Sequence, residues 1–468
     1  MLRLFFLLLF VNIGGLIFSQ PACNCIENLT FLSNSVEDNY ILFEEKIKDS
    51  SESVYNSFKQ TQMDSALVNN HFYSCFQILR TYMRWFRDPH LTVSLRTSEK
   101  TKSIYRDYFS DFPIDLRRKK KMQGELSGIF VSEGYGYVVE IIKEKEKYIG
   151  TILKGDNVFW FEKQARFYIN PSKKNYKTGK ILSYRKDHIL NTKPYDYSYA
   201  DSVLTVVNFD VFKKIASIED AKYVDFSFCE NAQLKLLSDS TSYFYFPNFE
   251  MNQKVIIDSL LLHYQNEILK RPNLIIDLRN NTGGYSSCFN NLLPLIFDKP
   301  YQMPSLQFKA SKENIIMHLN AYYRDSLNNK DYNRHKQFLM ENVGKLVDIN
   351  SVRLVVPDTV YKSPRRIVIL TDKGVVSSGE HLVFYGKMSG KVVQMGNSTA
   401  GMFNTLDVLD IRRMPSDFFH FNCPTMRYCN IGKIDYVGFS TDIELNFDKY
   451  SSWVEIVKNY LETDEKKK

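Results

Sequence analysis

The sequence lacks any hydrophobic run long enough to span a membrane. The longest such run, Leu4 to Phe18, is mostly apolar but falls short of the roughly twenty residues that a membrane helix needs. Because Arg3 precedes it, the run predicts a signal peptide over residues 1–22 that is cleaved after export. We therefore expect a periplasmic or secreted protein without a stable membrane span. Lipid anchoring through Cys23, as the cysteine of a loose lipobox, is the alternative.

Cysteine is also scarce, with seven in 468 residues. Cys23 and Cys25 stand close together but have no second pair at ligand spacing, so no metal site is expected. In an exported chain Cys423 and Cys429 could form a disulfide, and the odd count leaves at least one thiol free.

Strong charge of one sign is missing as well. The net charge is +8, and the basic residues are scattered or in short runs such as Arg117 to Lys121. Without aromatic interleaving or a nucleic-acid-binding motif, this pattern argues against nucleic-acid partners. The chain is 44% hydrophobic, which excludes a disordered or fibrous protein. At this length more than one domain is expected.

The most informative segment that is present joins a buried strand to a glycine turn. The apolar run Leu274 to Ile276 leads through Asp277 and Arg279 into Gly283-Gly284. Two glycines tolerate positive φ and let backbone N–H groups approach a ligand closely, as in an oxyanion hole or an anion nest. We expect the two charged side chains to pair with each other or with the turn backbone rather than to contact substrate.

A second segment repeats this pattern. The run Ile367 to Thr371 leads to Ser377 and Ser378, followed by an apolar-periodic helix. A hydroxyl at such a turn lies over a helix N-terminus, where developing negative charge is favoured. Taken alone, Ser377 would most often cap that helix, with Glu380 completing a Ser-x-x-Glu capping box.

Residues 28–87 have the periodicity of helices. Their pattern stops at Asp88-Pro89, because a residue before proline leaves the α region. His90 then opens the alternating run Leu91 to Leu95, a predicted strand. We expect Asp88 to cap or orient this junction.

The middle of the chain is rich in tyrosine, phenylalanine and β-branched residues. Tyr135 to Ile142 and Asn157 to Ile169 alternate as strands do, so residues 105–235 predict a β-rich insertion domain. Lys154 to Val158 weakly resembles the GDxI turn of a peptide-binding PDZ module, but the surrounding pattern does not support that fold.

From residue 236 onward the pattern becomes α/β. The predicted order is a strand at Tyr243 to Phe246, a helix at Ile257 to Ile268 and a strand at Leu274 to Leu278. Such an order predicts a crossover connection and a sheet with parallel members. Residues 311–348 are polar with helical periodicity, as in an insertion or lid.

Four motifs together resemble one family. LIIDLRNNTGG resembles the DLRxNxGG signature of the carboxyl-terminal processing (tail-specific) serine peptidases, and VVSSGEHLVFYGKMSGKVVQMGNSTAG resembles their nucleophile helix and the following strand. Phe86 to Thr92 is similar to the DGHT element of the tricorn-like and retinoid-binding-protein-like branch. Tyr436 to Glu444 resembles the GxGVxPDI element. The resemblance implies a crotonase-like (ClpP-like) α/β catalytic core.

The resemblance also assigns roles around a scissile carbonyl. It makes Ser377 the nucleophile, with Ser378 as the competing assignment. The N–H of Ser378, together with that of Gly283 or Gly284, would form the oxyanion hole. Where the tail-specific branch has a catalytic lysine this chain has Met402, which puts a Ser-Lys dyad in doubt.

The tricorn-like branch instead uses a histidine, and His90 matches its position although Pro89 replaces a glycine. An imidazole can accept the serine proton at neutral pH and return it to the leaving amine. In that branch a carboxylate also orients the site through a serine. Asp435 stands nearest to that carboxylate's position, while the serine has no clear counterpart beside His90.

The sequence thus predicts an exported serine peptidase that hydrolyses polypeptides or peptides without a metal or organic cofactor. A peptidase-like fold kept for binding or scaffolding stays open, and so does an acyl-CoA-handling crotonase. Oligomeric state is left open. The predicted units are a signal peptide (1–22), a helical segment with His90 (23–104), a β-rich domain (105–235), an α/β core (236–450) and a C-terminal helix with a polar tail (451–468).

Overall fold

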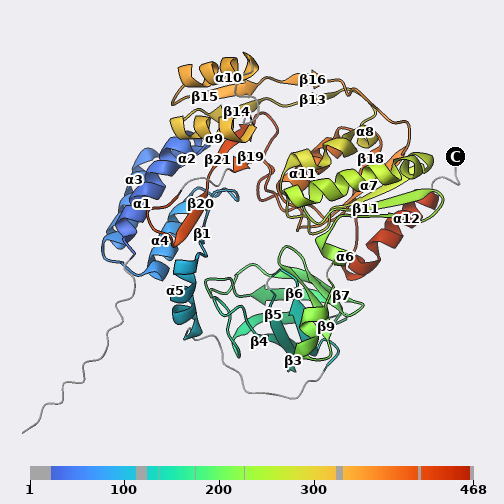
Figure 1. Cartoon of the computed structure of the whole chain (residues 1–468), viewed down its shortest axis with the longest axis horizontal. Coiled ribbons are helices and arrows are strands. Elements are labelled where there is room, and N and C mark those ends of the chain that lie inside the picture. Colours follow the sequence, from blue (N-terminus) through green and yellow to red (C-terminus); the bar gives the residue numbers. More distant parts are fainter. Residues whose placement is uncertain are drawn as a thin grey trace, which may run out of the picture.

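The computed structural model describes residues 23–111, 124–134, 136–173, 175–225, 227–322, 330–408 and 413–463. The predicted signal peptide over residues 1–22, the basic run Arg117 to Lys121, Tyr135 and the end of the polar tail lie outside these ranges. In Figure 1 the elements form three groups: N-terminal helices with small sheets, a green barrel, and an α/β core that ends in the red helix α12 (Trp453–Thr463).

The N-terminal group is helical, as predicted. Its helices are α1 (Cys25–Asn39), α2 (Phe43–Ser50), α3 (Glu52–Leu67) and α4 (Phe72–Trp85), followed by strand β1 (Thr92–Leu95) and helix α5 (Glu99–Ser110). The buried face of α4 holds Phe72, Leu79 and Met83 among others, at the spacing of an amphipathic helix. A disulfide between Cys25 and Cys75 joins α1 to α4. The helices therefore present the His90 segment on a rigid base.

The middle domain is a closed eight-stranded antiparallel barrel, which confirms the β-rich prediction. Its strands are β2 (Gly128–Ser132), β3 (Val138–Glu144), β4 (Lys147–Lys154), β5 (Ala165–Pro171), β6 (Thr178–Ser183), β7 (Tyr195–Ala200), β8 (Val203–Val206) and β9 (Asp210–Ile215). The strand predicted from Asn157 starts only at Ala165. Before it, the Asp156 carboxylate accepts the N–H groups of Val158, Phe159 and Trp160 and holds a turn instead.

A mixed six-stranded sheet forms the α/β core. Its order is β10 (Gln233–Leu236), β11 (Thr241–Tyr245), β12 (Asn273–Asp277), β17 (Arg366–Thr371), β18 (Val392–Gly396) and β22 (Ile443–Glu444). β10 is antiparallel to β11, whereas the other neighbours are parallel. The predicted parallel sheet is confirmed. Parallel strands end at one edge, and there β12 and β17 lead into the two predicted site turns.

Helices cover both faces of this sheet (Figure 1). The apolar residues of β12 alternate between them: Leu274 and Ile276 pack in the cluster with α7 (Met251–Lys270) and α11 (Ser378–Lys387), and Ile275 packs in the cluster with α12. Among the short elements, η1 (Ile218–Tyr223) lies against β2 and β9 of the barrel. The others are α6 (Ser227–Glu230), η2 (Ser286–Leu292), α8 (Leu293–Ile296) and η4 (Phe447–Ser452). Burial on two faces explains the continuous apolar runs of the central strands.

The segment predicted as a helical insertion contains α9 (Lys312–Tyr322) and α10 (Lys330–Glu341). The two helices pack on a sheet ordered β15 (Leu346–Asn350), β14 (Leu306–Lys309), β21 (Pro424–Tyr428) and β19 (Thr405–Val408). Two further ribbons are β13 (Tyr301–Met303) with β16 (Arg353–Val355), and β1 with β20 (Phe419–Asn422). Asn314 Nδ2 donates to the carbonyl of Asn39, 3.0 Å away, so this insertion is bonded to the N-terminal helices.

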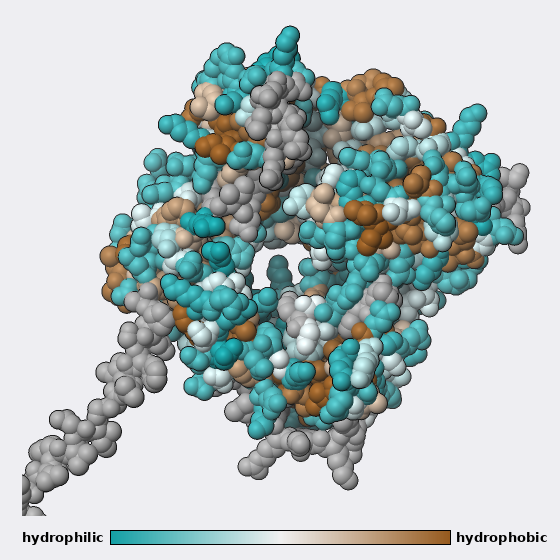
Figure 2. Space-filling view, in the orientation of Figure 1, coloured by the Kyte–Doolittle hydropathy of each residue, from teal (hydrophilic) through white to brown (hydrophobic). Residues whose placement is uncertain are grey.

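The three groups surround an opening near the centre of the view in Figure 2. Polar residues colour much of the surface around it. Among the described residues, no helix combines the length and the apolar character that crossing a membrane requires.

Candidate active site

Ser377 lies at the turn between β17 and α11 in an unusual backbone conformation. Its φ is 51° and its ψ is −120°, a left-handed region that non-glycine residues rarely occupy. Hydrogen bonds to the turn that follows β12 hold the Ser377 turn in place. Val376 N–H donates to the Asn281 carbonyl at 3.0 Å, and Asp372 accepts from the N–H of Asn280 at 3.0 Å. Strain of this kind concentrates at functional sites.

The structure brings His90 to this turn from almost three hundred residues away. The Nε2 atom of His90 lies 3.5 Å from Ser377 Oγ, at the outer limit of a hydrogen bond. Nucleophile–base contacts are often this long when no substrate is bound. His90 is 6% exposed, and Ser377 is half-buried. The two groups therefore face one another, as the sequence analysis required.

A threonine that the sequence analysis missed contacts the other ring nitrogen of His90. Thr405, on β19, places Oγ1 3.2 Å from His90 Nδ1 and 3.1 Å from both carboxylate oxygens of Asp88. Since the hydroxyl has one proton and donates it to the carboxylate, it accepts from Nδ1–H. His90 then carries its proton on Nδ1 and leaves Nε2 as the acceptor for Ser377.

Asp88 anchors this arrangement. It accepts from the backbone N–H of His90 and from the hydroxyl of Tyr40, each at 2.8 Å, in addition to Thr405. The carboxyl group is buried, which raises its pKa, and these donors counteract the effect. The prediction that Asp88 orients the junction is confirmed by these bonds.

Burial also sets the protonation of the base. Removal from water lowers the pKa of His90 to about 4, although the nearby Asp435 carboxylate acts in the opposite direction. His90 is therefore a neutral imidazole at neutral pH, the form that can accept a proton.

The glycine turn lies directly against the serine turn. A Cβ added to Gly283, whose φ is +78°, would stand 2.8 Å from Ser377 Cβ. The N–H of Gly283 already donates to Asn281 Oδ1 at 3.0 Å. By contrast, the N–H groups of Gly284 and Ser378 have no acceptor within the described ranges. Of the two glycines considered, Gly284 is thus the one with an available donor, and it is exposed.

The capping box expected at the start of α11 needs correction. Ser377 makes no capping hydrogen bond with its side chain, so the predicted capping box is wrong. The Glu380 carboxylate instead accepts from Thr399 Oγ1 and from the N–H groups of Gly401 and Met402. It holds the turn where the tail-specific branch has its lysine.

Asp435 does not bond to His90. Its carboxylate accepts the N–H groups of Phe403 and Asn404 at 2.8 and 2.9 Å, the two residues that precede Thr405. It therefore supports Thr405 through the backbone. The carboxylate that contacts a hydroxyl beside His90 is Asp88, through Thr405, and not Asp435.

Comparison with known proteins points to one peptidase family. Residues 241–444, which hold both site turns, match the model of peptidase family S41. Over these residues the chain is similar to peptidase family S41. No curated protein sequence matches it.

Solved structures resemble this chain over nearly its whole length. Mature CPAF aligns with a TM-score of 0.51 at 11% identity, covering 93% of this chain and 96% of the other. Mature CPAF in complex with lactacystin gives 0.51 at 12% identity, covering 94% and 98%. The tricorn protease gives 0.42 at 13% identity, covering 94% of this chain and 36% of its own. At these identities the likeness concerns the fold.

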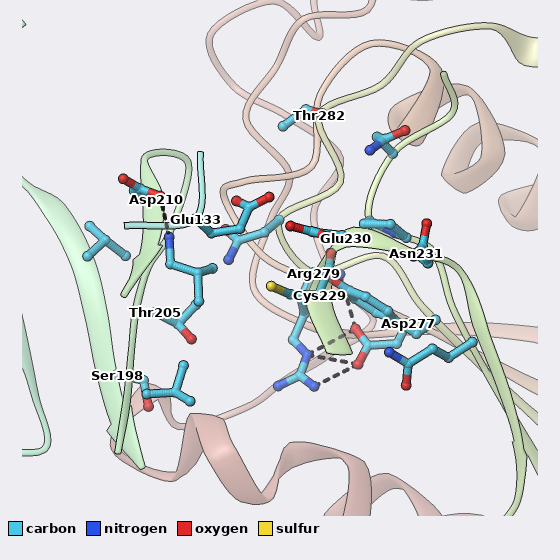
Figure 3. A pocket seen from close by; sticks show the side chains of 18 of the residues that line it. Glu133, Ser198, Thr205, Asp210, Cys229, Glu230, Asn231, Asp277, Arg279 and Thr282 are labelled. Carbon is cyan, nitrogen blue, oxygen red and sulfur yellow. Dashed lines mark hydrogen bonds and ion pairs between the residues drawn. The ribbon is translucent and has the colours of Figure 1, made fainter. Parts of the chain in front are cut away.

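A cavity of about 1020 Å³ lies between the barrel and the core (Figure 3). Its floor holds Asp277 and Arg279, whose side chains pair at 2.6 Å. Arg279 also donates to the carbonyl of Tyr450, and Tyr243 donates to Asp277. These charges are satisfied within the protein, so the predicted pairing is confirmed. Neither Ser377 nor His90 lines the cavity.

The cysteines differ from expectation. Cys25 pairs with Cys75, whereas Cys423 and Cys429 form no disulfide with each other, so the suggested bond between them is wrong. Within the described ranges no group of three or more histidine, cysteine or acidic side chains could hold a metal ion. Cys23 is buried, with 1% of its surface exposed.

Proposed function

We propose that this protein is a serine peptidase that cleaves peptide bonds of polypeptides or peptides through an acyl-enzyme on Ser377. The observation that carries the proposal is the contact of His90 Nε2 with Ser377 Oγ at 3.5 Å, beside backbone N–H groups without acceptors. Ser377 is preferred over Ser378 because the Ser378 hydroxyl already donates to the Gly284 carbonyl at 2.6 Å. The proposed catalytic core is crotonase-like.

In the proposed mechanism His90 is the general base. As Ser377 Oγ attacks the scissile carbonyl, its proton passes to Nε2, and the carbonyl oxygen becomes an oxyanion. The N–H groups of Gly284 and Ser378 donate to that oxygen, and one such donor is typically worth about 3–4 kcal/mol. The imidazolium then protonates the leaving amine, and water hydrolyses the ester by the same route.

The hydroxyl of Thr405 acts on this cycle through His90. It keeps the proton of the neutral ring on Nδ1 and, with Asp88, stabilises the imidazolium that forms. Asp435 contributes by holding the Phe403-Asn404 backbone. Both are positioning residues for the base.

We also propose export after cleavage of the signal peptide and retain the predicted division of the chain, with the barrel as the insertion domain. The disulfide in the N-terminal helices favours an oxidising compartment. Burial of Cys23 favours release over lipid anchoring.

The test is labelling with a fluorophosphonate, which phosphonylates activated serines, together with hydrolysis of an unstructured polypeptide. The wild type should carry one label, located on Ser377 by peptide mass spectrometry. S377A should lose label and hydrolysis, and H90A should lose about 10²- to 10⁴-fold in rate.

A matched control exists in the same chain. Ser94 Oγ lies 2.9 Å from His420 Nε2 across β1 and β20, a second serine–histidine contact away from the glycine turn. S94A should react like the wild type. An unlabelled, inactive wild type would favour the binding or scaffolding alternative, and a label on Ser378 would move the nucleophile.

A further inference from the structure

Behind the proposed nucleophile, three side chains that have no role in proton transfer form a connected series. Ser378 Oγ donates to the Gly284 carbonyl at 2.6 Å. Ser286 Oγ lies 3.3 Å from Ser378 Oγ and 3.2 Å from His381 Nδ1. We call His381, Ser286 and Ser378 the serine–histidine chain. It joins the first turn of α11 to the glycine turn and the start of η2.

The direction of the hydrogen bonds follows from counting protons. The Gly284 carbonyl can only accept, so it takes the single hydroxyl proton of Ser378. Ser378 Oγ must then accept from Ser286, which uses the proton of Ser286. Ser286 Oγ accepts in turn from His381, and this requires a proton on Nδ1 of the ring.

The surroundings of His381 suit a neutral donor. Its side chain is 8% exposed and packs edge-on against the rings of Phe403 and Tyr428. Burial lowers its pKa to about 3, and the neighbouring His90 acts in the same direction. The ring is therefore neutral, with one proton to place.

The position of the chain links both donors of the proposed oxyanion hole. Ser378 supplies one of them from its backbone, and its side chain holds Gly284, which supplies the other. The 2.6 Å bond thereby fixes the spacing of two amides that come from separate turns. Ser286 and His381 keep the Ser378 hydroxyl turned toward Gly284 rather than toward the substrate.

We infer that His381, Ser286 and the Ser378 side chain are positioning residues that set the geometry of the oxyanion hole. This inference rests on the proposed peptidase function. It adds a second histidine to the site, with a task distinct from that of His90: His381 orients the donors of the hole and takes no proton from Ser377.

The first test determines the direction of the hydrogen bonds and does not depend on catalytic activity. In protein labelled with ¹⁵N-histidine, two-bond proton–nitrogen correlations should show His381 with its proton on Nδ1, assigned by the signal missing from H381N. In S286A the proton should move toward Nε2, which free histidine prefers. A proton on Nε2 of His381 in the wild type would contradict the inferred hydrogen-bond directions of the serine–histidine chain.

The second test measures turnover. S286A, S378A and H381F should lower kcat by up to about a hundredfold with little change in KM, because donors are displaced rather than substrate contacts removed. H381F keeps an aromatic ring but no donor. H381N should restore most of kcat, because its side-chain amide can donate from near the place of Nδ1.

Pairs of substitutions show whether the residues act as one unit. The double variant S286A/H381F should be no slower than either single variant, since breaking the chain once suffices. The neighbour Ser287 is exposed, and S287A should leave kcat unchanged. Full kcat in S286A together with a wild-type Nδ1 proton would refute the positioning role. An inactive, unlabelled wild type would instead refute the proposed function, and the nitrogen shifts would still decide the hydrogen-bond chain.

Discussion

His90 is linked to Asp88 through a hydroxyl rather than directly. Thr405 Oγ1 lies 3.2 Å from His90 Nδ1 and donates to the Asp88 carboxylate at 3.1 Å. A direct carboxylate partner would stabilise the imidazolium more strongly, and here burial holds the pKa of His90 at about 4. The neutral ring is consequently favoured over a wide pH range.

Removal of this hydroxyl should impair the base. T405V keeps the shape of the side chain but leaves His90 Nδ1 without an acceptor, so the ring can turn or change tautomer. We expect a loss of kcat/KM on the order of 10²-fold, while T405S keeps most of the activity. Steady-state kinetics on a polypeptide substrate measure the difference. Equal activity of T405V and wild type would remove Thr405 from the mechanism.

The acid limb of the pH profile of kcat/KM should lie at a lower pH than an ordinary histidine would give. kcat/KM reports the ionisation of the free enzyme, so its acid limb should fall near pH 4 instead of near 6.5, the ordinary value for histidine. At pH 5 about nine-tenths of the sites would then hold a neutral base, against a few hundredths for an unshifted histidine. A limb near pH 6.5 would contradict the buried position of His90.

The same burial of histidines should make the folded protein less stable in acid. Burial also lowers the pKa values of His188 and His318 to about 4. As pH falls from 6.5 toward 4, the unfolded chain binds protons at these residues and at His90, while the folded chain does not. The free energy of unfolding should therefore decrease through this window and be unaffected by these groups above it. Urea denaturation at pH 7 and pH 5 measures the decrease.

Gly283 offers a test of the contact between the two turns. In G283A the new Cβ would stand 2.8 Å from Ser377 Cβ, so the serine turn must shift. A shift of about 1 Å can cost on the order of 10²-fold in rate. Gly344 is the matched control, because its φ of +87° is similar but nothing lies within 4 Å of the added Cβ. G344A should lose about 1–2 kcal/mol of stability and keep its activity.

If G283A and G344A are similarly stable but only G283A loses activity, the loss comes from the displaced serine turn and not from backbone strain. If G283A retained full labelling and turnover, the glycine turn would have no part in the geometry of the nucleophile.

The elements that the sequence predicted well are those whose pattern is local. β12 and β17 are apolar runs that end in turns, and α4 has its buried residues three and four positions apart. His90 and Ser377 were found through motifs. Each of these signals is contained within a short stretch of chain.

Thr405 and His381 could not be found in this way. Thr405 reaches His90 only because β19 folds back beside the N-terminal helices, and a single threonine in a strand has no distinguishing pattern. Glu380 has the spacing of a capping box, but its buried carboxylate instead accepts three hydrogen bonds from the turn at residues 399–402. Local motifs therefore located the proposed reacting groups but not the residues that contact them.

The disulfide shows the same limit, because the spacing of seven cysteines does not determine their pairing. Cys25 and Cys75 are 50 residues apart and join α1 to α4, the helix that ends just before the Asp88-Pro89-His90 turn.

Reduction of this disulfide should lower the free energy of unfolding of the wild type by about 2–5 kcal/mol, measured by urea denaturation with and without dithiothreitol. The variant C25A/C75A should be insensitive to the reductant, whereas C429A, which removes a free thiol, should respond like the wild type. If the wild type were equally stable in both conditions, the N-terminal helices would hold His90 by packing alone.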